Sequence, residues 1–169
     1  MPAKAERVFV GVGANQPGRR RVVAAALNAL RKLPTNRGFH CSPLYETSPW
    51  GGVPQPDFLN AVVELKLRLD PHEALDELLG LEYRLKRRRQ AETRWGPRVV
   101  DLDLLAHGDR VVQRPGLVVP HPRLAQRRFV LQPWSDLAPE FEVPGLGLVA
   151  DLLRACTDAV SVTRLENGS

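Results

Sequence analysis

Apolar side chains recur along the chain at two spacings, one typical of strands and the other typical of helices. Residues 58–69 alternate between apolar and more polar positions, which predicts a strand with one apolar face. Residues 19–33 instead carry apolar side chains at helical spacing and stop before Pro34, which predicts a helix. The apolar face of the predicted strand consists of Leu59, Ala61, Val63, Leu65, Leu67 and Leu69.

Local start and stop signals place the remaining elements. Asp70 is expected to be the N-cap of a second helix, because its side chain can accept a hydrogen bond from the first turn and Pro71 fits the first helical position. The other predicted elements are a strand at 7–12, an extended segment at 38–48 interrupted by Pro43, a proline- and glycine-rich loop at 49–56, a strand around Asp101 and Asp103, a short helix around Leu124 and a weaker helix near 149–155.

The order of these elements indicates a fold class. Strand, helix, strand, strand, helix, strand is the order of the ferredoxin-like (βαββαβ) sandwich, so we expect an α+β protein of that type with additional C-terminal elements. The length of 169 residues suits one domain with a full core, and no internal repeat is present. Residues 1–169 are therefore expected to form a single domain.

Charge and composition narrow the kinds of ligand and compartment. The chain has 24 Lys and Arg against 19 Asp and Glu, a formal charge of +5, so nucleic acid, an acidic membrane surface and a polyphosphate are all plausible anionic partners. It has two cysteines, no apolar signal region at its start and no apolar span of 18 residues. We therefore expect a cytoplasmic protein.

Two aspartates stand inside an apolar strand pattern, in the segment "RWGPRVVDLDLLAHG". Asp101 and Asp103 are two residues apart, so their side chains share one face of the predicted strand. A buried carboxylate without a partner is costly, and each of the two could pair with one of the many arginines. The alternative is a magnesium site, since Mg²⁺ prefers oxygen ligands and is usually completed by phosphate oxygens and water. Two such ions can clamp a phosphoryl group in transfer.

A run of basic residues precedes the aspartates, in "RLKRRRQAETR" at residues 84–94. It could be the solvated end of a helix, or it could meet the remaining charge of a polyphosphate bound by the aspartates. An RNA-binding module on the same sandwich is the alternative from another class. The segment "RGFHCSP" begins like the aromatic RNA-recognition motif and then lacks its stacking aromatics, so this hypothesis is the weaker one.

Three further features are candidates for ligand contact. The glycines of "GVGANQPG" fail the dinucleotide fingerprint at Gln16 and predict a strand-to-helix turn that could still let a ligand approach. His121 has no second metal-binding residue at zinc spacing, so a zinc site is set aside. Phe58 and Asn60 share the strand face opposite Leu59, which offers a flat heterocycle a ring to stack on and an amide to read its edge.

Four ordered segments between residues 8 and 139 resemble one known family. They are "VGVGANQPGRR", "SPLYETSPWGGVPQPDFLNAVVEL", "RWGPRVVDLDLLAHGD" and "VVPHPRLAQRRFVLQPWSDLAPE". The chain is similar in them to the 6-hydroxymethyl-7,8-dihydropterin pyrophosphokinases of folate biosynthesis. The resemblance implies transfer of the pyrophosphoryl group of ATP to the pterin hydroxymethyl, release of AMP, two Mg²⁺ ions, and no nucleic acid, membrane or obligate protein partner.

The resemblance also implies roles for individual residues. The metal ligands would be Asp101 and Asp103, and the phosphate-facing arginines would be Arg87, Arg89 and Arg98. The further nucleotide contacts would be His121 and Arg127 on the triphosphate and the backbone near Leu104 on the adenine. The pterin contacts would be Phe58 and Phe129 on its two faces, Asn60 on its polar edge, and backbone groups at Thr47 and Trp50.

Overall fold

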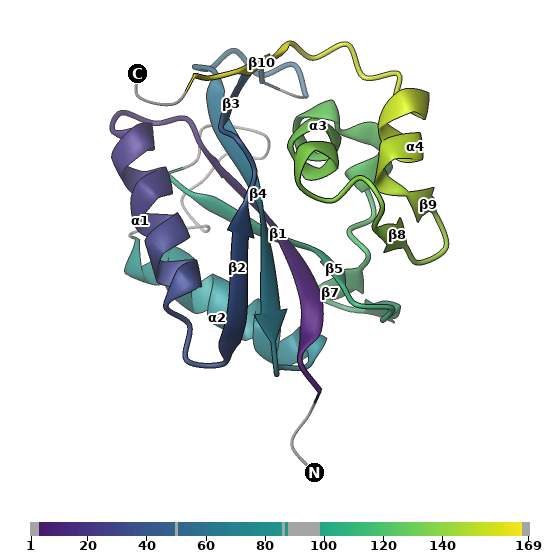
Figure 1. The fold of residues 1–169 in the computed structure, drawn as a ribbon. Helices are drawn as coiled ribbons and strands as arrows, with labels where there is room; N and C mark the ends of the chain where they lie inside the picture. The colour runs from purple at the N-terminus through teal and green to yellow at the C-terminus, as the bar shows by residue number, and fades with distance from the viewer. Residues whose placement is uncertain (1–3, 50, 86, 88–98, 167–169) are drawn as a thin grey trace.

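The computed structural model describes residues 4–49, 51–85, 87 and 99–166, and Figure 1 shows the course of the chain. Four α-helices and an antiparallel sheet dominate the described part, which confirms the mixed α and β composition expected from the sequence. The elements in chain order are β1 (Glu6–Ala14), α1 (Arg19–Arg31), β2 (Asn36–Cys41), β3 (Tyr45–Thr47), β4 (Phe58–Leu67), α2 (Pro71–Arg84), β5 (Asp101–His107), β6 (Val112–Arg114), β7 (Leu117–Val119), the 3-10 helix η2 (Leu124–Gln126), α3 (Arg128–Leu137), β8 (Glu142–Val143), β9 (Gly147–Leu148), α4 (Val149–Ala155) and β10 (Val162–Arg164).

The main sheet is organised around β1 and β4, its two long central strands. Its strand order is β10-β3-β4-β1-β5, and all the pairs are antiparallel. β2 also pairs with β4, along the half of β4 that β3 leaves free. Because β1 lies between β4 and β5, residues from these three strands stand side by side on each face of the sheet.

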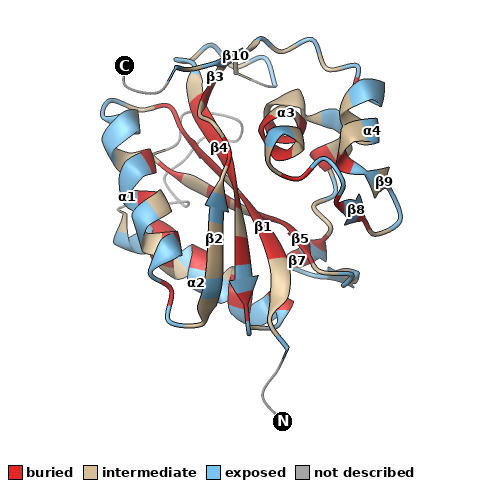
Figure 2. Cartoon of the chain, in the orientation of Figure 1, coloured by how far each residue is buried: buried red, intermediate tan, exposed pale blue. Residues whose placement is uncertain are grey.

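Helices cover both faces of the sheet (Figures 1 and 2). α1 and α2 pack on one face, where the predicted apolar stripe of β4 from Leu59 to Leu67 is buried. α3 packs on the other face, where Phe9, Val62 and Trp134 belong to a second core. Burial on both faces explains why the strands contain more apolar residues than a half-exposed strand requires.

The predicted start of α2 is confirmed in detail. Asp70 accepts a hydrogen bond of 2.9 Å from the backbone of Glu73, and the Glu73 side chain accepts one of 2.8 Å from the backbone of Asp70. Pro71 occupies the first helical position. This reciprocal capping satisfies backbone groups that a helix start leaves without partners.

Some expectations differ from the structure. α3 was not predicted, because its sequence begins with arginine and contains Pro133, a residue unfavourable inside a helix. The short strands β6 to β10 also lack a pattern long enough to predict. The strand predicted at 7–12 extends to Ala14, so Gly13 lies within β1 and the predicted strand-to-helix turn follows at residues 15–18. Among the described residues, no helix combines the length and apolar character that crossing a membrane requires.

Candidate active site

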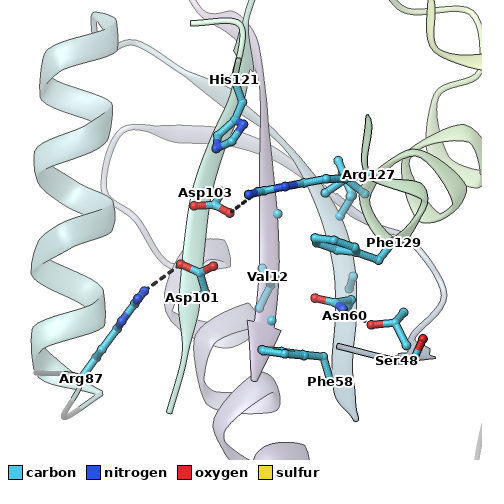
Figure 3. Close-up of a pocket in the computed structure, with 16 residues that line it drawn as sticks. Val12, Ser48, Phe58, Asn60, Arg87, Asp101, Asp103, His121, Arg127 and Phe129 are labelled. Carbon is cyan, nitrogen blue, oxygen red and sulfur yellow. Dashed lines mark hydrogen bonds and ion pairs between the residues drawn. The ribbon is translucent and has the colours of Figure 1, made fainter. Parts of the chain in front are cut away.

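A pocket lies on the α3 face of the sheet, next to the N-terminal end of that helix (Figure 3). It is lined by residues of β1, β3, β4, β5 and α3 and of the segments that follow β3, α2, β7 and η2. Most of the predicted site residues meet there, namely Thr47, Phe58, Asn60, Arg87, Asp101, Asp103, His121, Arg127 and Phe129. Trp50, Arg89 and Arg98 lie outside the described residues. Leu104 is buried in the core under the opposite face of β5.

β5 explains why two acids stand in an apolar segment. Asp101 and Asp103 point to the pocket with side chains 32% and 27% exposed, whereas Leu102 and Leu104 between and after them are buried in the core. The carboxylates are therefore accessible to a ligand on one side of the strand. Carboxylate oxygens are the donors that Mg²⁺ prefers.

Arg87 lies between two carboxylates (Figure 3 shows the bond to Asp101). Its Nη1 donates to Oδ1 of Asp101 at 2.7 Å and to Oε2 of Glu82 at 2.8 Å. The Arg87 side chain is only 3% exposed, and Glu82 also accepts a bond of 2.8 Å from the backbone of Leu102. A buried arginine requires such partners, because an uncompensated buried charge is costly. Glu82 was not predicted as part of the site.

Arg127 faces the second aspartate. Nη1 of Arg127 lies 4.0 Å from Oδ2 of Asp103, and its guanidinium lies over the ring of Phe129 at 5.6 Å from the ring centroid. Burial lowers the pKa of Arg127 from its ordinary value. Arginine nevertheless stays charged at neutral pH, so the pocket keeps a cation beside Asp103.

His121 is neutral at pH 7 in this environment. Its pKa is lowered to about 4, mainly by burial and also by the nearby charge of Arg127, while the charge of Asp101 acts in the opposite direction. Its Nδ1 accepts a hydrogen bond of 3.2 Å from the backbone of Arg123. In the neutral ring the proton is then on Nε2, which can donate to an acceptor in the pocket.

The other end of the pocket is aromatic and carries an amide. Figure 3 shows the rings of Phe58 and Phe129 with the Asn60 side chain near both. Asn60 is buried, and its Nδ2 donates to Oγ1 of Thr47 at 2.6 Å. Phe58 and Asn60 come from β4, while Phe129 is in the first turn of α3.

These features define a class of protein. One pocket holds two carboxylates, the buried Arg87 and the partly buried Arg127 at one end, and two aromatic rings with an amide at the other. Such a pocket suits a phosphorylated ligand beside a flat ring, on a small α and β fold.

Comparison with known proteins gives the family. Residues 9–139 match the family model described as 7,8-dihydro-6-hydroxymethylpterin-pyrophosphokinase (HPPK). A 2-amino-4-hydroxy-6-hydroxymethyldihydropteridine pyrophosphokinase of Pseudomonas aeruginosa is 41% identical over 151 residues, which are 89% of this chain and 92% of the relative. A protein of the same name from Methylorubrum extorquens is 39% identical over 139 residues, 82% of this chain and 87% of the relative.

A solved structure gives the same fold. The wild-type HPPK-DHPS of Plasmodium falciparum superposes with a TM-score of 0.70 at 14% sequence identity, covering 89% of this chain. This chain spans only 44% of that longer chain. The protein belongs to the HPPK family. The resemblance noted in the sequence is confirmed, and with it the predicted pyrophosphoryl transfer to 6-hydroxymethyl-7,8-dihydropterin in folate biosynthesis.

Proposed function

We propose that this chain uses ATP as the pyrophosphoryl donor, requires Mg²⁺ and releases AMP. The observation that supports this is one pocket in which Asp101 and Asp103, beside one buried and one partly buried arginine, face the same space as Phe58, Asn60 and Phe129. In the reaction, the pterin hydroxyl oxygen forms a bond to the β-phosphorus of ATP. The bond from that phosphorus to the bridging oxygen of AMP breaks, and the hydroxyl proton is lost.

The donor set at β5 fits magnesium. Within the described ranges, no group of three or more His, Cys, Asp or Glu residues could enclose a metal ion. The proposed protein ligands are therefore limited to the two aspartates. Mg²⁺ keeps several water molecules and takes phosphate oxygens as further ligands, so two carboxylates are enough. We assign Asp101 and Asp103 as ligands of two ions, which would neutralise phosphate charge and help to orient the reacting groups.

The basic residues around the aspartates would hold the triphosphate. Arg87 and Arg127 are positioned by Asp101 and Asp103, and their guanidinium groups match phosphate oxygens in charge and geometry. His121 would donate a hydrogen bond from Nε2. Two further roles stay predictions from the resemblance. They are phosphate contacts by Arg89 and Arg98 and an adenine contact by the backbone near Leu104.

The aromatic end would hold the pterin. Phe58 and Phe129 would stack on the two faces of the ring, and Asn60 would read its polar edge with help from the backbone at Thr47 and Trp50. This places the pterin at one end of the pocket and the phosphates at the other. Pyrophosphoryl transfer leaves little covalent chemistry to the protein, so holding the two substrates in this order is the main task of these residues.

Other features of the proposal concern the whole chain. The order β1, α1, β2, β4, α2, β5 and the pairing of β5, β1, β4 and β2 support a ferredoxin-like arrangement at the centre of the fold. Three statements about the whole chain stay predictions. They are a single domain over residues 1–169, a cytoplasmic location, and small molecules as the ligands without nucleic acid, membrane or obligate protein partners.

A direct assay tests the reaction. The protein is incubated with ATP, Mg²⁺ and 6-hydroxymethyl-7,8-dihydropterin, and AMP is measured with and without the pterin and with EDTA. AMP formation that requires both the pterin and the metal supports the proposal. Absence of AMP together with salt-sensitive binding of RNA would overturn it in favour of the RNA-binding alternative.

A further inference from the structure

Three residues stand in one row across the central strands of the sheet. Gly13 of β1 is the Cα partner of Asn60 on β4 and of Asp101 on β5. Directly opposite residues of antiparallel strands project to the same face of the sheet. Asn60, which is proposed to read the pterin, and Asp101, which is proposed to bind metal, are therefore separated across the sheet by one residue. That residue is Gly13, which has no side chain.

The space above Gly13 is filled by Asn60. A Cβ atom built on Gly13 would lie 2.5 Å from Oδ1 of Asn60, a separation that carbon atoms do not tolerate. Gly11, two residues earlier on the same face, differs in this respect. Its Cβ would meet the methyl groups of Leu105 at 3.6 Å, which is ordinary van der Waals contact. On this face of β1, the close approach of the Asn60 side chain to the backbone requires a glycine at position 13. No comparably close contact requires a glycine at position 11.

Asn60 has little freedom to make room for a larger residue. Its Nδ2 donates to Oγ1 of Thr47 at 2.6 Å, and the whole residue is 8% exposed. Its amide is thus fixed by Thr47 through Nδ2 while Oδ1 lies over Gly13. A methyl group at position 13 would move the end of this side chain, because a side-chain amide yields more easily than the backbone of two paired strands.

We propose that Gly13 is a positioning residue for the pterin. By lacking a side chain, it lets the Asn60 amide lie across β1 in the orientation fixed by Thr47, and so controls pterin affinity through Asn60. The inference rests on the proposed role of Asn60 in pterin recognition. Glycine at this position is required for the arrangement of the pterin site, whereas the sheet itself tolerates alanine.

The experiment compares Gly13→Ala with the wild-type protein by calorimetric titration with 6-hydroxymethyl-7,8-dihydropterin. We expect the pterin Kd and KM to rise at least tenfold, while the KM for ATP changes less than about threefold. The side-chain amide resonances of Asn60 in a nitrogen-15 NMR spectrum should shift without any ligand. Gly38→Ala is the matched control. Gly38 is also a strand glycine, its Cβ would meet Lys66 carbons at 3.6 Å or more, and it lies outside the pocket.

A double-mutant cycle separates positioning from a general structural effect. In an Asn60→Ala background, Gly13→Ala should weaken pterin binding no further, because the amide that it displaces is absent. Full additivity of the two effects would overturn the inference. If Gly13→Ala lowers Tm, the Tm of the double variant shows whether the loss comes from the contact with Asn60 or from the sheet itself. A Tm equal to that of Asn60→Ala supports the steric contact, and a further loss contradicts it. Failure of the wild-type protein to bind the pterin would instead refute the proposed function.

Discussion

Nη1 of Arg87 lies 2.7 Å from Oδ1 of Asp101, so the most deeply buried arginine of the pocket is hydrogen-bonded to one of the two carboxylates assigned to metal. The same nitrogen bonds to Glu82, which is almost completely buried. The sequence left two interpretations of the aspartates open, ion pairing with arginine and metal binding. The structure shows the ion pair, and the proposal is that an Arg87 held in this way also meets phosphate beside Asp101.

Arg87→Ala should lower kcat at least about tenfold, roughly 1.4 kcal/mol of barrier, because a positioned charge beside the phosphates is lost. The pterin Kd should change little, since Phe58, Asn60 and Phe129 are untouched. The variant should also lose about 3 kcal/mol of unfolding free energy, because the buried ion pair between Arg87 and Glu82 is lost. Steady-state kinetics, calorimetry and urea unfolding measure the three effects.

Arg84→Ala is the matched control for this prediction. Arg84 belongs to the same basic run at the end of α2, but its side chain is exposed. Its replacement should leave kcat unchanged and alter stability by less than about 0.5 kcal/mol. Equal and small effects of the two substitutions on kcat would show that the run acts only as a charged surface.

Asp101→Ala and Asp103→Ala should each reduce turnover at least about a hundredfold while the protein stays folded, because each removes a proposed metal ligand. In Asp101→Ala the buried Arg87 keeps Glu82 as its partner, so no buried charge is left alone. Turnover at saturating Mg²⁺ and thermal unfolding test this. Asp109→Ala, an exposed acid just after β5, is the control. Unfolding of either variant with full activity per folded molecule would favour a structural ion pair.

The sequence predicted well those features that depend on neighbouring residues. Alternation placed Phe58 and Asn60 opposite the apolar face of β4, and spacing placed Asp101 and Asp103 on one face of β5. The capping residues fixed the start of α2. Each of these depends on strand or helix periodicity, which a single segment reveals without knowledge of the rest of the chain.

Features that depend on contacts distant in sequence could not be predicted. Arg87 stands in a charge run typical of a solvated surface, and its burial arises only because α2 and β5 bring Glu82 and Asp101 to it. Glu82 itself left a signal, since it continues the buried stripe of Ala74 and Leu78 on α2, where an acid is unexpected. The close contact of Gly13 with Asn60 requires the pairing register of β1 and β4.

The Cys41 thiol should react slowly with thiol reagents. Burial raises its pKa to about 11, with the charge of Arg31 acting in the opposite direction. Because the thiolate is the reactive form, only about a thousandth of the thiol is reactive at pH 8, and the rate should rise about tenfold per pH unit until the pKa is reached. Labelling of a Cys156→Ser variant with a disulfide reagent measures Cys41 alone. Fast labelling of the folded protein at pH 8 would contradict the prediction.

The neutral His121 should make the metal-free protein lose stability in mild acid. Its pKa is lowered to about 4, mainly by burial, so between pH 6.5 and 4 the unfolded chain binds a proton that the folded protein does not. The contribution of neutral His121 to the free energy of unfolding is complete above pH 6.5 and is lost as the pH falls towards 4. In urea unfolding, the wild-type protein should therefore lose free energy relative to His121→Gln over this range, since glutamine does not titrate. Asp101→Asn removes the charge that raises the His121 pKa, so NMR titration of this variant should give a still lower value. Parallel pH profiles for the wild type and His121→Gln would mean that His121 titrates alike in the folded and unfolded protein.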